Sequence, residues 1–400
     1  MPANIANVNT GVGFAQAATL MNSIVQQATG KASLTATSTA EFVSQAQTAL
    51  LTGTDPLMNA ISTVLSKTIF SVRPYNARFV GLQRDAVQWG NHVRKINFCA
   101  TGVENEDRYD LTDGNSVDQQ IVKKPGVLQT NFYSYDSYQN HYTIFRDQLD
   151  AAFRGPDEFM RFISGVTTEV TNKLEQYREN FSRMTLCNLI ASTHNRGRVR
   201  HLLTEYATLM NITDGAAENP QIDPTKVLPD HIDGFTKWLF AELRILSDRF
   251  TERSLLYQTN VSGYDIYRHT PKENQRLYIY SPFLAQIDAR VLSAVFNPGY
   301  LNLGEREEVS FWQSIETPDT INITPNQMNP ANGQYALGER VNTKILGILM
   351  DYEAAGVTQV HEWASPSPFN ARGGYTNFWY HIDMRGWNDN TEKAVVLALD

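Results

Sequence analysis

The longest periodic pattern of apolar positions in the chain runs from about Pro156 to His194. Gly155 precedes Pro156, and proline suits the first position of a helix. About 38 residues would span roughly 57 Å at 1.5 Å per residue. The pattern predicts one long helix that serves as a strut, which is more typical of an architectural protein than of an enzyme. Its apolar positions follow the spacing of one buried helix face: Phe159, Ile163, Val166, Val170, Leu174, Tyr177, Phe181, Met184 and Cys187.

The other positions of this helix predict how it packs. Two charged pairs at i,i+4 spacing, Glu169–Lys173 and Glu179–Arg183, mark the side expected to face solvent. Gly165 interrupts the pattern, which predicts a bend or a point of close packing. Because the apolar stripe includes aromatic residues and is flanked by strand-like segments, we expect the helix to pack on a sheet of its own subunit.

Residues 1–72 have the composition of an arm. Ser38 and Glu41 form a capping box that opens a helix through about Leu51, and Asp55 caps a second short helix through about Phe70. We expect a segment so poor in charge to pack on the body of the protein or on a neighbour, and a frayed terminus is the alternative. Before position 67 the only charged residues are Lys31, Glu41 and Asp55.

Residues 73–131 predict strands joined by an extended acidic loop. Asp113-Gly114-Asn115 is typical of a tight turn. A projecting acidic hairpin fits this pattern, and a plain solvated loop fits it as well. Between Glu104 and Asp118 the chain has one basic residue, Arg108, and six acidic residues: Glu104, Glu106, Asp107, Asp110, Asp113 and Asp118.

The remaining chain alternates strand-like and helix-like patterns, so the fold class expected is α+β. Prolines mark a linker at 214–232, and an amphipathic helix follows over 235–250. The other expected elements are an aromatic strand over 132–145, a strand over 276–280, a helix from Ser281 that stops near 297–299, a turn-rich stretch over 300–340, a buried strand over 344–350 and an aromatic strand over 374–387. The resulting division is 1–72 (arm), 73–131 (strands and acidic loop), 132–213 (long-helix part), 214–345 (second lobe) and 346–400 (strands returning to the long-helix part).

Length and composition exclude several classes of protein. The 400 residues exceed the size at which a single core stops growing, so more than one lobe is expected. A net charge of −8 argues against a general nucleic-acid binder. Two cysteines cannot build a disulfide framework, and Cys187 on the apolar stripe is expected to be a buried thiol. The sequence contains no apolar run long enough to span a membrane and no basic stretch of a signal peptide.

Candidate chemistry is scarce. The sequence has no phosphate-binding loop, nucleophile elbow or zinc-binding helix motif. Around Asp113-Gly114 the ligand positions of a calcium loop are not filled, and the histidines are dispersed. We therefore expect no enzyme, no cofactor and no metal.

A basic cluster follows the long helix and contains Arg196, Arg198 and Arg200. It could contact phosphates or the acidic loop of another copy. The alternative is a favourable charge at the carboxyl end of the helix. With Glu104, Glu106, Asp107, Asp110 and Asp113, these arginines are the candidate contacts between subunits or with a genome.

Two short stretches carry a resemblance to a known family. One begins Asn140-His141-Tyr142-Thr143-Ile144 and continues through Asp147, Leu149, Ala152 and Phe153 to Phe159; the other is Asn370-Ala371-Arg372-Gly373-Gly374-Tyr375-Thr376-Asn377-Phe378-Trp379-Tyr380-His381. Together with the order of arm, acidic loop, aromatic strand, long helix and mixed lobe, they resemble the major capsid protein of tailed double-stranded-DNA bacteriophages. The likeness is to the small short-tailed phages of the Salas family.

That resemblance implies the Hong Kong 97-type fold, with an N-terminal arm, an extended E-loop, a P-domain that carries a long spine helix, and an A-domain. It implies a shell protein of the virion that assembles with itself into pentamers and hexamers in the host cytoplasm, without catalysis. A portal, scaffolding or decoration proteins and packaged DNA bound without sequence specificity would be its partners, with no membrane.

The chain departs from some relatives. Residues 101–122 contain no lysine, so we do not expect the E-loop crosslink that some relatives form. The arm is shorter than the scaffolding segment that some relatives remove, so we expect it to stay.

Two other functions are open from the sequence. One is a cellular nanocompartment shell of the same fold. The other is a glycan-binding surface or tail protein that uses the aromatic strands, with Tyr133 and Tyr135 as candidate contacts.

Overall fold

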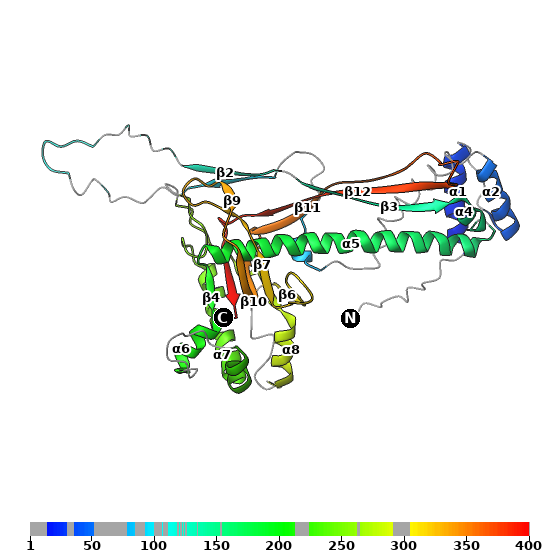
Figure 1. The fold of residues 1–400 in the computed structure, drawn as a ribbon. Coiled ribbons are helices and arrows are strands. Elements are labelled where there is room, and N and C mark those ends of the chain that lie inside the picture. Colours follow the sequence, from blue (N-terminus) through cyan, green and yellow to red (C-terminus); the bar gives the residue numbers. More distant parts are fainter. Residues whose placement is uncertain are drawn as a thin grey trace, which may run out of the picture.

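The structure of the chain is a computed structural model, in which helices and sheets are mixed (Figure 1). It describes residues 14–29, 36–51, 78–84, 93–99, 126–133, 135–152, 154–212, 224–261, 265–290 and 305–399, with single residues and one short piece between 106 and 124. The predicted short helix near 55–70 lies outside the described residues.

One helix, α5 (Pro156–Asn195), forms the long axis of the molecule (Figure 1). It has 40 residues and confirms the predicted helix, with its end one residue beyond the expected one. Pro156 occupies its first turn, and Gly155 before it has an extended backbone. The helix contacts two different sheets, one along each half.

The first sheet covers the amino-terminal half of α5. It contains β3 (Asp136–Phe145), β11 (Ala355–Pro366) and β12 (Tyr375–Asn388), in the antiparallel order β11-β12-β3. Phe378 and Ile382 of β12 share a buried core with Val170, Leu174 and Phe181 of the helix. The predicted packing of the long helix on a sheet of its own subunit is therefore confirmed.

The arm closes the far end of this core. The helices α1 (Phe14–Thr29) and α2 (Thr39–Leu51) lie there beside the short α4 (Arg146–Ala152) (Figure 1). Met21 and Phe42 are fully buried in the same core as the helix and sheet. The capping box of α2 is confirmed, because Ser38 Oγ accepts the Glu41 N–H at 3.3 Å. Helix α1 was not predicted from the sequence.

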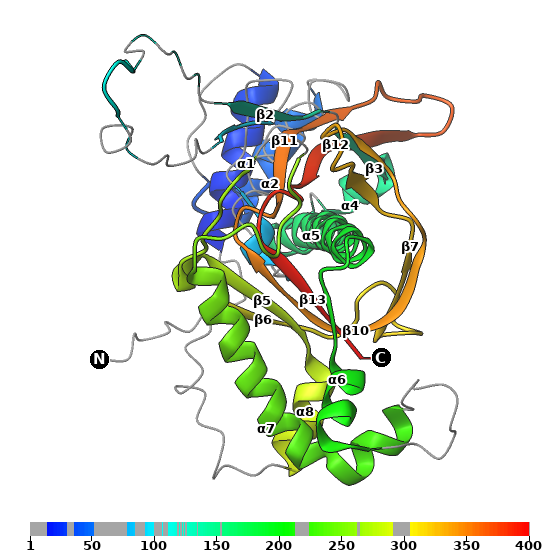
Figure 2. The same ribbon diagram turned by 90° about the vertical axis from the view of Figure 1, so that its left-hand side faces the viewer.

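The second sheet lies against the carboxyl-terminal half of α5, and Figure 2 shows the helix end-on between the two sheets. Its order is β4-β13-β10-β5-β6, with β7 paired to the start of β10. Ile348 of β10 and Val396 of β13 face Ile190 of the helix. The strands are β4 (Val199–His201), β5 (Gln275–Tyr280), β6 (Glu305–Val309), β7 (Thr320–Ile323), β10 (Val341–Asp351) and β13 (Ala394–Ala398).

Helices cover the other face of this second sheet. They are α6 (Leu202–Met210), α7 (Pro224–Thr251) and α8 (Ser281–Arg290), and their core includes Leu203, Phe235 and Leu349. The predicted linker at 214–232 is wrong in its second half, because α7 already begins at Pro224. A proline is compatible with the first helical position, so it does not exclude a helix there.

The remaining elements are short. They are the hairpin strands β1 (Val93–Phe98) and β2 (Val127–Phe132), the pair β8 (Asn326–Met328) and β9 (Tyr335–Leu337), and two turns of 3₁₀ helix, η1 (Val80–Leu82) and η3 (Lys272–Asn274). The single aromatic strand expected over 132–145 is two strands, since β2 ends at Phe132 and β3 begins at Asp136. Several short strands lie in the stretch expected to be only turn-rich. The domain boundaries stay a prediction.

The helix α5 changes its buried side along its length. At 3.6 residues per turn, Val170, Leu174 and Phe181 lie on one side, whereas Glu179 and Ile190 lie on the opposite side. The side of α5 that contacts the first sheet therefore points away from the second sheet. This geometry explains two errors of the sequence analysis.

The first error concerns Glu179 and Arg183, which were expected to face solvent. Their ion pair, at 2.6 Å, is buried. The second error concerns Met184, which continues the first apolar side past the end of its sheet and is 52% exposed. The Glu169–Lys173 pair, at 3.1 Å, is solvent-exposed as expected. A Cβ at Gly165 would meet nothing within 4 Å, so close packing does not explain that glycine.

Alanine should have opposite effects on the free energy of unfolding at Gly347 and at Gly165. A Cβ at Gly347 would lie 2.6 Å from the backbone oxygen of Tyr278, between paired strands, so Gly347→Ala should lower the free energy of unfolding by roughly 1–3 kcal/mol. Gly165→Ala, in the open helix, should raise it by about 1 kcal/mol. Urea denaturation of the free subunit measures both changes, and equal stability of Gly347→Ala and the unchanged chain would contradict the packing described.

Candidate assembly surfaces

The hairpin of β1 and β2 is held to the body by polar side chains. The strands pair antiparallel from Val93 opposite Phe132 to Phe98 opposite Val127. On β1, Lys95 and Asn97 point toward the body, while Ile96 and Phe98 point away. The usual arrangement, with apolar residues inward, is therefore inverted on this strand, and alternation alone could not identify its anchoring face.

Lys95 is the main anchor of the hairpin. Its Nζ lies 2.9 Å from a carboxylate oxygen of Glu353 and 3.0 Å from one of Asp389, and it also pairs with Glu392. Arg268 joins the cluster, 2.9 Å from Glu392, and donates a hydrogen bond of 2.8 Å to the side-chain oxygen of Asn97. We call these residues, Lys95, Asn97, Arg268, Glu353, Asp389 and Glu392, the hairpin anchor.

The charges of the hairpin anchor do not balance. Three carboxylates face two cations, and most of the group is buried. Burial, with a smaller contribution from the neighbouring Asp389, raises the pKa of Glu392 to about 7 against the lowering effect of Lys95 and Arg268. Burial disfavours the charged form of Lys95, but Asp389 and Glu392 outweigh that effect and raise the pKa of Lys95 overall.

The outward face of the hairpin is apolar at its loop end, while Arg94 and Gln129 on the same face are polar and exposed. Phe98 is 73% exposed, and Ile96 and Val127 are also exposed. Val122, in the connection between the strands, is exposed as well. A patch of this kind on a projecting element is typical of a surface that another protein covers.

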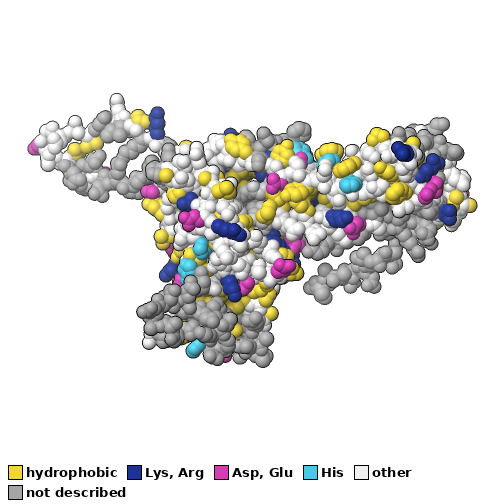
Figure 3. All heavy atoms as spheres, viewed as in Figure 1, with side chains coloured by type: hydrophobic (Ala, Val, Ile, Leu, Met, Phe, Trp, Pro, Cys, Tyr) yellow, Lys and Arg dark blue, Asp and Glu magenta, His cyan; other side chains and the backbone are white. Residues whose placement is uncertain are grey.

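The acidic loop lies in the connection of this hairpin, as the sequence predicted. Glu106 and Asp113 are exposed, whereas Glu104, Asp107 and Asp110 lie outside the described residues. The predicted turn is confirmed: Gly114 has φ +90°, and the N–H of Asn115 donates to the carbonyl of Thr112 at 3.0 Å. Figure 3 shows this loop extending away from the body.

The three arginines after α5 make their contacts within the chain. Arg196 donates to the carbonyl of Met328, and Arg200 pairs with Glu205 and, at 3.2 Å, with Glu242. These arginines therefore already have partners, and their contact with another subunit or a genome stays a prediction. On the face drawn in Figure 3, basic and acidic side chains are interspersed rather than gathered by sign.

Arg198 lies deepest of the three. It donates at 3.0 Å to both the carbonyl of Tyr257 and the hydroxyl of Thr259. Burial lowers its pKa to about 10, since a charged guanidinium is less stable away from water. Arg198 therefore joins the end of α5 to the loop that follows α7.

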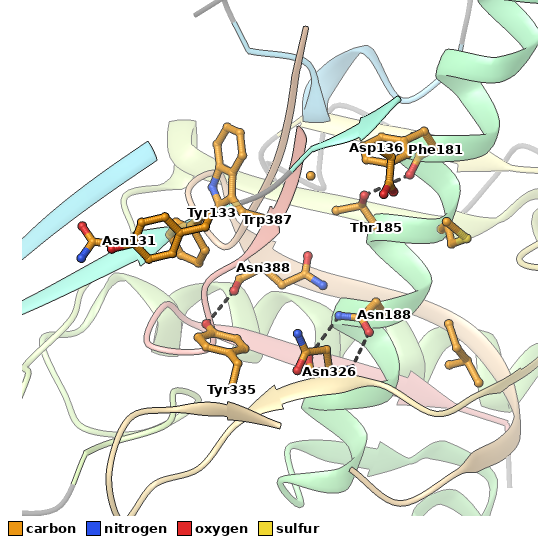
Figure 4. A pocket seen from close by; sticks show the side chains of 14 residues that line it. Asn131, Tyr133, Asp136, Phe181, Thr185, Asn188, Asn326, Tyr335, Trp387 and Asn388 are labelled. Carbon is orange, nitrogen blue, oxygen red and sulfur yellow. Dashed lines mark hydrogen bonds between the residues drawn. The ribbon is translucent and has the colours of Figure 1, made fainter. Parts of the chain in front are cut away.

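A groove that the sequence analysis missed lies beside the exposed side of α5 (Figure 4). Its volume is about 420 Å³. Met184 and Asn188 of α5 form one wall, and Trp387 and Asn388 at the end of β12 form another. Tyr133, which follows β2, and Tyr335 of β9 complete it. We call this site the α5 groove; no local sequence signal marks it, because its walls come from five distant segments.

Two searches identify the relatives of the chain. A family model described as "Phi29-like phage major capsid protein" matches residues 21–398. The chain belongs to this family. No protein with a curated description matches it.

Solved structures similar to this family member include phage capsids. The capsid structure of Staphylococcus phage Andhra is 9% identical, with 81% of this chain and 84% of that chain covered and a TM-score of 0.53. A structure of native bacteriophage P68, described as its head fiber and inner core protein gp22, is 9% identical over 81% and 85% of the chains, with a TM-score of 0.49. The Andhra likeness shows a shared fold.

The family fixes the general function. This family member is a major capsid protein, which forms the shell of a phage virion. That assignment favours a phage shell over the nanocompartment alternative. No helix in the described part of the chain is long and apolar enough to cross a membrane. In the described part of the chain, no group of three or more His, Cys, Asp or Glu side chains is arranged to hold a metal ion.

The raised pKa of Glu392 predicts a pH-dependent stability. Its ordinary value is 4.5, so the folded chain binds the proton more tightly than the unfolded chain. Its contribution is complete below pH 4.5 and is lost as the pH rises through about 7. Between pH 8 and pH 5 the unchanged subunit should gain about 1–3 kcal/mol of unfolding free energy relative to Glu392→Gln. Urea denaturation across this range tests it, and parallel curves for the two proteins would refute it.

Proposed function

We propose that the chain is the subunit of an icosahedral shell with the Hong Kong 97-type arrangement. Residues 1–72 would be the N-terminal arm, 73–131 would carry the E-loop, and 132–213 with the strands of 346–400 would form the P-domain around α5. Residues 214–345 would form most of the A-domain. The long helix on a three-stranded sheet supports this division, and so does a second sheet in which β5, β6 and β7 come from 214–345 and join strands of the P-domain part.

The projecting hairpin is the observation that carries the proposal. Its inward face is fixed by the hairpin anchor, so its direction relative to the body is set within the subunit. Its outward face leaves Phe98 and Ile96 in water, which is unfavourable unless a neighbour covers them. A neighbouring subunit in the shell would cover this face.

The acidic residues of the loop are the proposed polar part of that contact. Glu104, Glu106, Asp107, Asp110 and Asp113 would meet basic or N–H donor groups of the neighbour. Arg196, Arg198 and Arg200 are weaker candidates for contacts outside the subunit, because they already have partners within the chain. The glycan-binding alternative stays a prediction.

The wider assembly follows from the same proposal. Pentamers and hexamers of the chain would enclose double-stranded DNA without sequence specificity, and the net charge of −8 suits a container that does not grip its genome. A portal and scaffolding or decoration proteins would take part, and the shell would assemble in the host cytoplasm. The subunit would need no cofactor and catalyse no reaction.

Neutralising the acidic loop tests the proposed contact. A variant with Glu104→Gln, Glu106→Gln, Asp107→Asn, Asp110→Asn and Asp113→Asn should need at least a roughly tenfold higher subunit concentration to assemble, which corresponds to ~1.4 kcal/mol. Its melting temperature should not change, because the described loop residues are exposed. Light scattering and electron microscopy measure the assembly.

Glu316→Gln with Glu339→Gln is the matched control, since both residues are exposed and lie outside the hairpin. The control should assemble as the unchanged chain does. Assembly of the loop variant at the control's concentration would contradict a role of the loop in subunit contacts. An unchanged chain that forms no shells or rings, even with its scaffold, would contradict the proposed function itself.

A further inference from the structure

The α5 groove has an apolar wall that the folded subunit leaves uncovered. Met184 lies on the side of α5 that the first sheet covers around Phe181, but the sheet does not continue over it. Its side chain is therefore half-exposed within an otherwise buried helical stripe. Tyr133 across the groove is also exposed. An apolar residue of this kind is most stable when a second surface covers it.

The groove also contains a buried polar atom that lacks a partner. Asn388 is 7% exposed, and its side-chain oxygen accepts no hydrogen bond from the described residues. In Figure 4 its amide extends from the end of β12 toward α5, into the groove. Buried carbonyl oxygens of this kind are nearly always hydrogen-bonded. The oxygen is also closed to solvent in the free subunit, so an N–H donor in the groove reaches it only after the Asn388 amide rotates outward.

The walls of the groove are fixed before anything binds. The hydroxyl of Tyr335 donates to the backbone carbonyl of Asn388 at 2.6 Å. Asn188 holds the start of β8 through two hydrogen bonds with the backbone of Asn326, at 2.8 and 3.2 Å. Beside these, Gly386 allows β12 to approach α5 closely, because a Cβ there would lie 2.5 Å from Thr185 Oγ1. A preformed groove binds at a lower entropic cost than a mobile one.

The charges of the groove restrict its occupant. Among the described residues that line the groove, Asp136 is the only ionisable acid or base apart from the tyrosine hydroxyls. Amides and aromatic rings make up most of the remainder, including Asn131, Phe132 and Trp387. Such a lining suits a neutral segment with apolar side chains and exposed peptide N–H groups, and it disfavours an anion.

We propose that the α5 groove is a contact between subunits, filled in the shell by a neutral segment of a second copy of the chain. The segment covers Met184 and supplies an N–H donor to Asn388, whose amide rotates toward the groove to accept it. A second copy is the favoured occupant because a shell places identical subunits against each other at every position. The inference rests on the proposed function, and it adds a surface distinct from the projecting hairpin.

Cysteine labelling tests this contact without depending on folding defects. Met184→Cys places a thiol in the groove, and the native Cys99 and Cys187 are buried, so they contribute little background. N-ethylmaleimide should react with this variant in free subunits and at least about tenfold more slowly in assembled shells. Shells dissociated and relabelled should regain the rate of free subunits.

A pair of substitutions tests whether assembly needs the contact. Met184→Glu should abolish shell formation and leave the melting temperature of the free subunit unchanged, while the matched neutral Met184→Gln should assemble. Equal labelling of Met184→Cys in shells and free subunits would overturn the inference and leave the groove open to other ligands. Assembly of Met184→Glu at the unchanged yield would overturn it as well. Failure of the unchanged chain to assemble would instead count against the proposed function.

Discussion

The structure depends on one helix that serves two cores on opposite sides. Val170, Leu174 and Phe181 pack against the first sheet, and after half a turn of reorientation Ile190 packs against the second. Neither sheet contacts the whole helix, so α5 fixes the position of one lobe relative to the other. The same reorientation leaves Met184 uncovered and buries Glu179 with Arg183, which lie where one core gives way to the other.

Buried ion pairs attach the segments that lie between or outside the two cores to the body of the subunit. Arg183 pairs with Glu179 and lies 3.7 Å from the centre of the Phe311 ring, so the turn after β6 is tied to the helix. The hairpin anchor does the same for β1. Buried ion pairs add little net stability, but removing one partner leaves an unpaired charge that costs about 3–5 kcal/mol. We infer that these ion pairs set the direction in which the attached segments leave the body. That direction matters for a subunit whose projecting parts must reach its neighbours.

The sequence predicted the parts that depend on local periodicity. The helix predicted over 156–194, the capping box at Ser38 and the strand predicted over 276–280 are present within one residue of those bounds, because their patterns need no distant partner. The change of buried side along α5 was not predictable, since it arises from two sheets formed by residues far away. Likewise, the inverted face of β1 depends on carboxylates some 250 to 300 residues further along the chain, such as Glu392. The arginine cluster was visible, but its internal partners were not.

We infer that α5 holds both cores of a subunit whose hairpin and groove meet other copies. Electron cryo-microscopy of assembled shells, at a resolution that traces side chains, tests it most directly. We predict a continuous helix over 156–195 in every subunit, with Phe98 of the hairpin and Met184 of the α5 groove each buried against a neighbouring copy. Shells in which the hairpin folds back on its own subunit, and the groove remains open to solvent, would contradict the account.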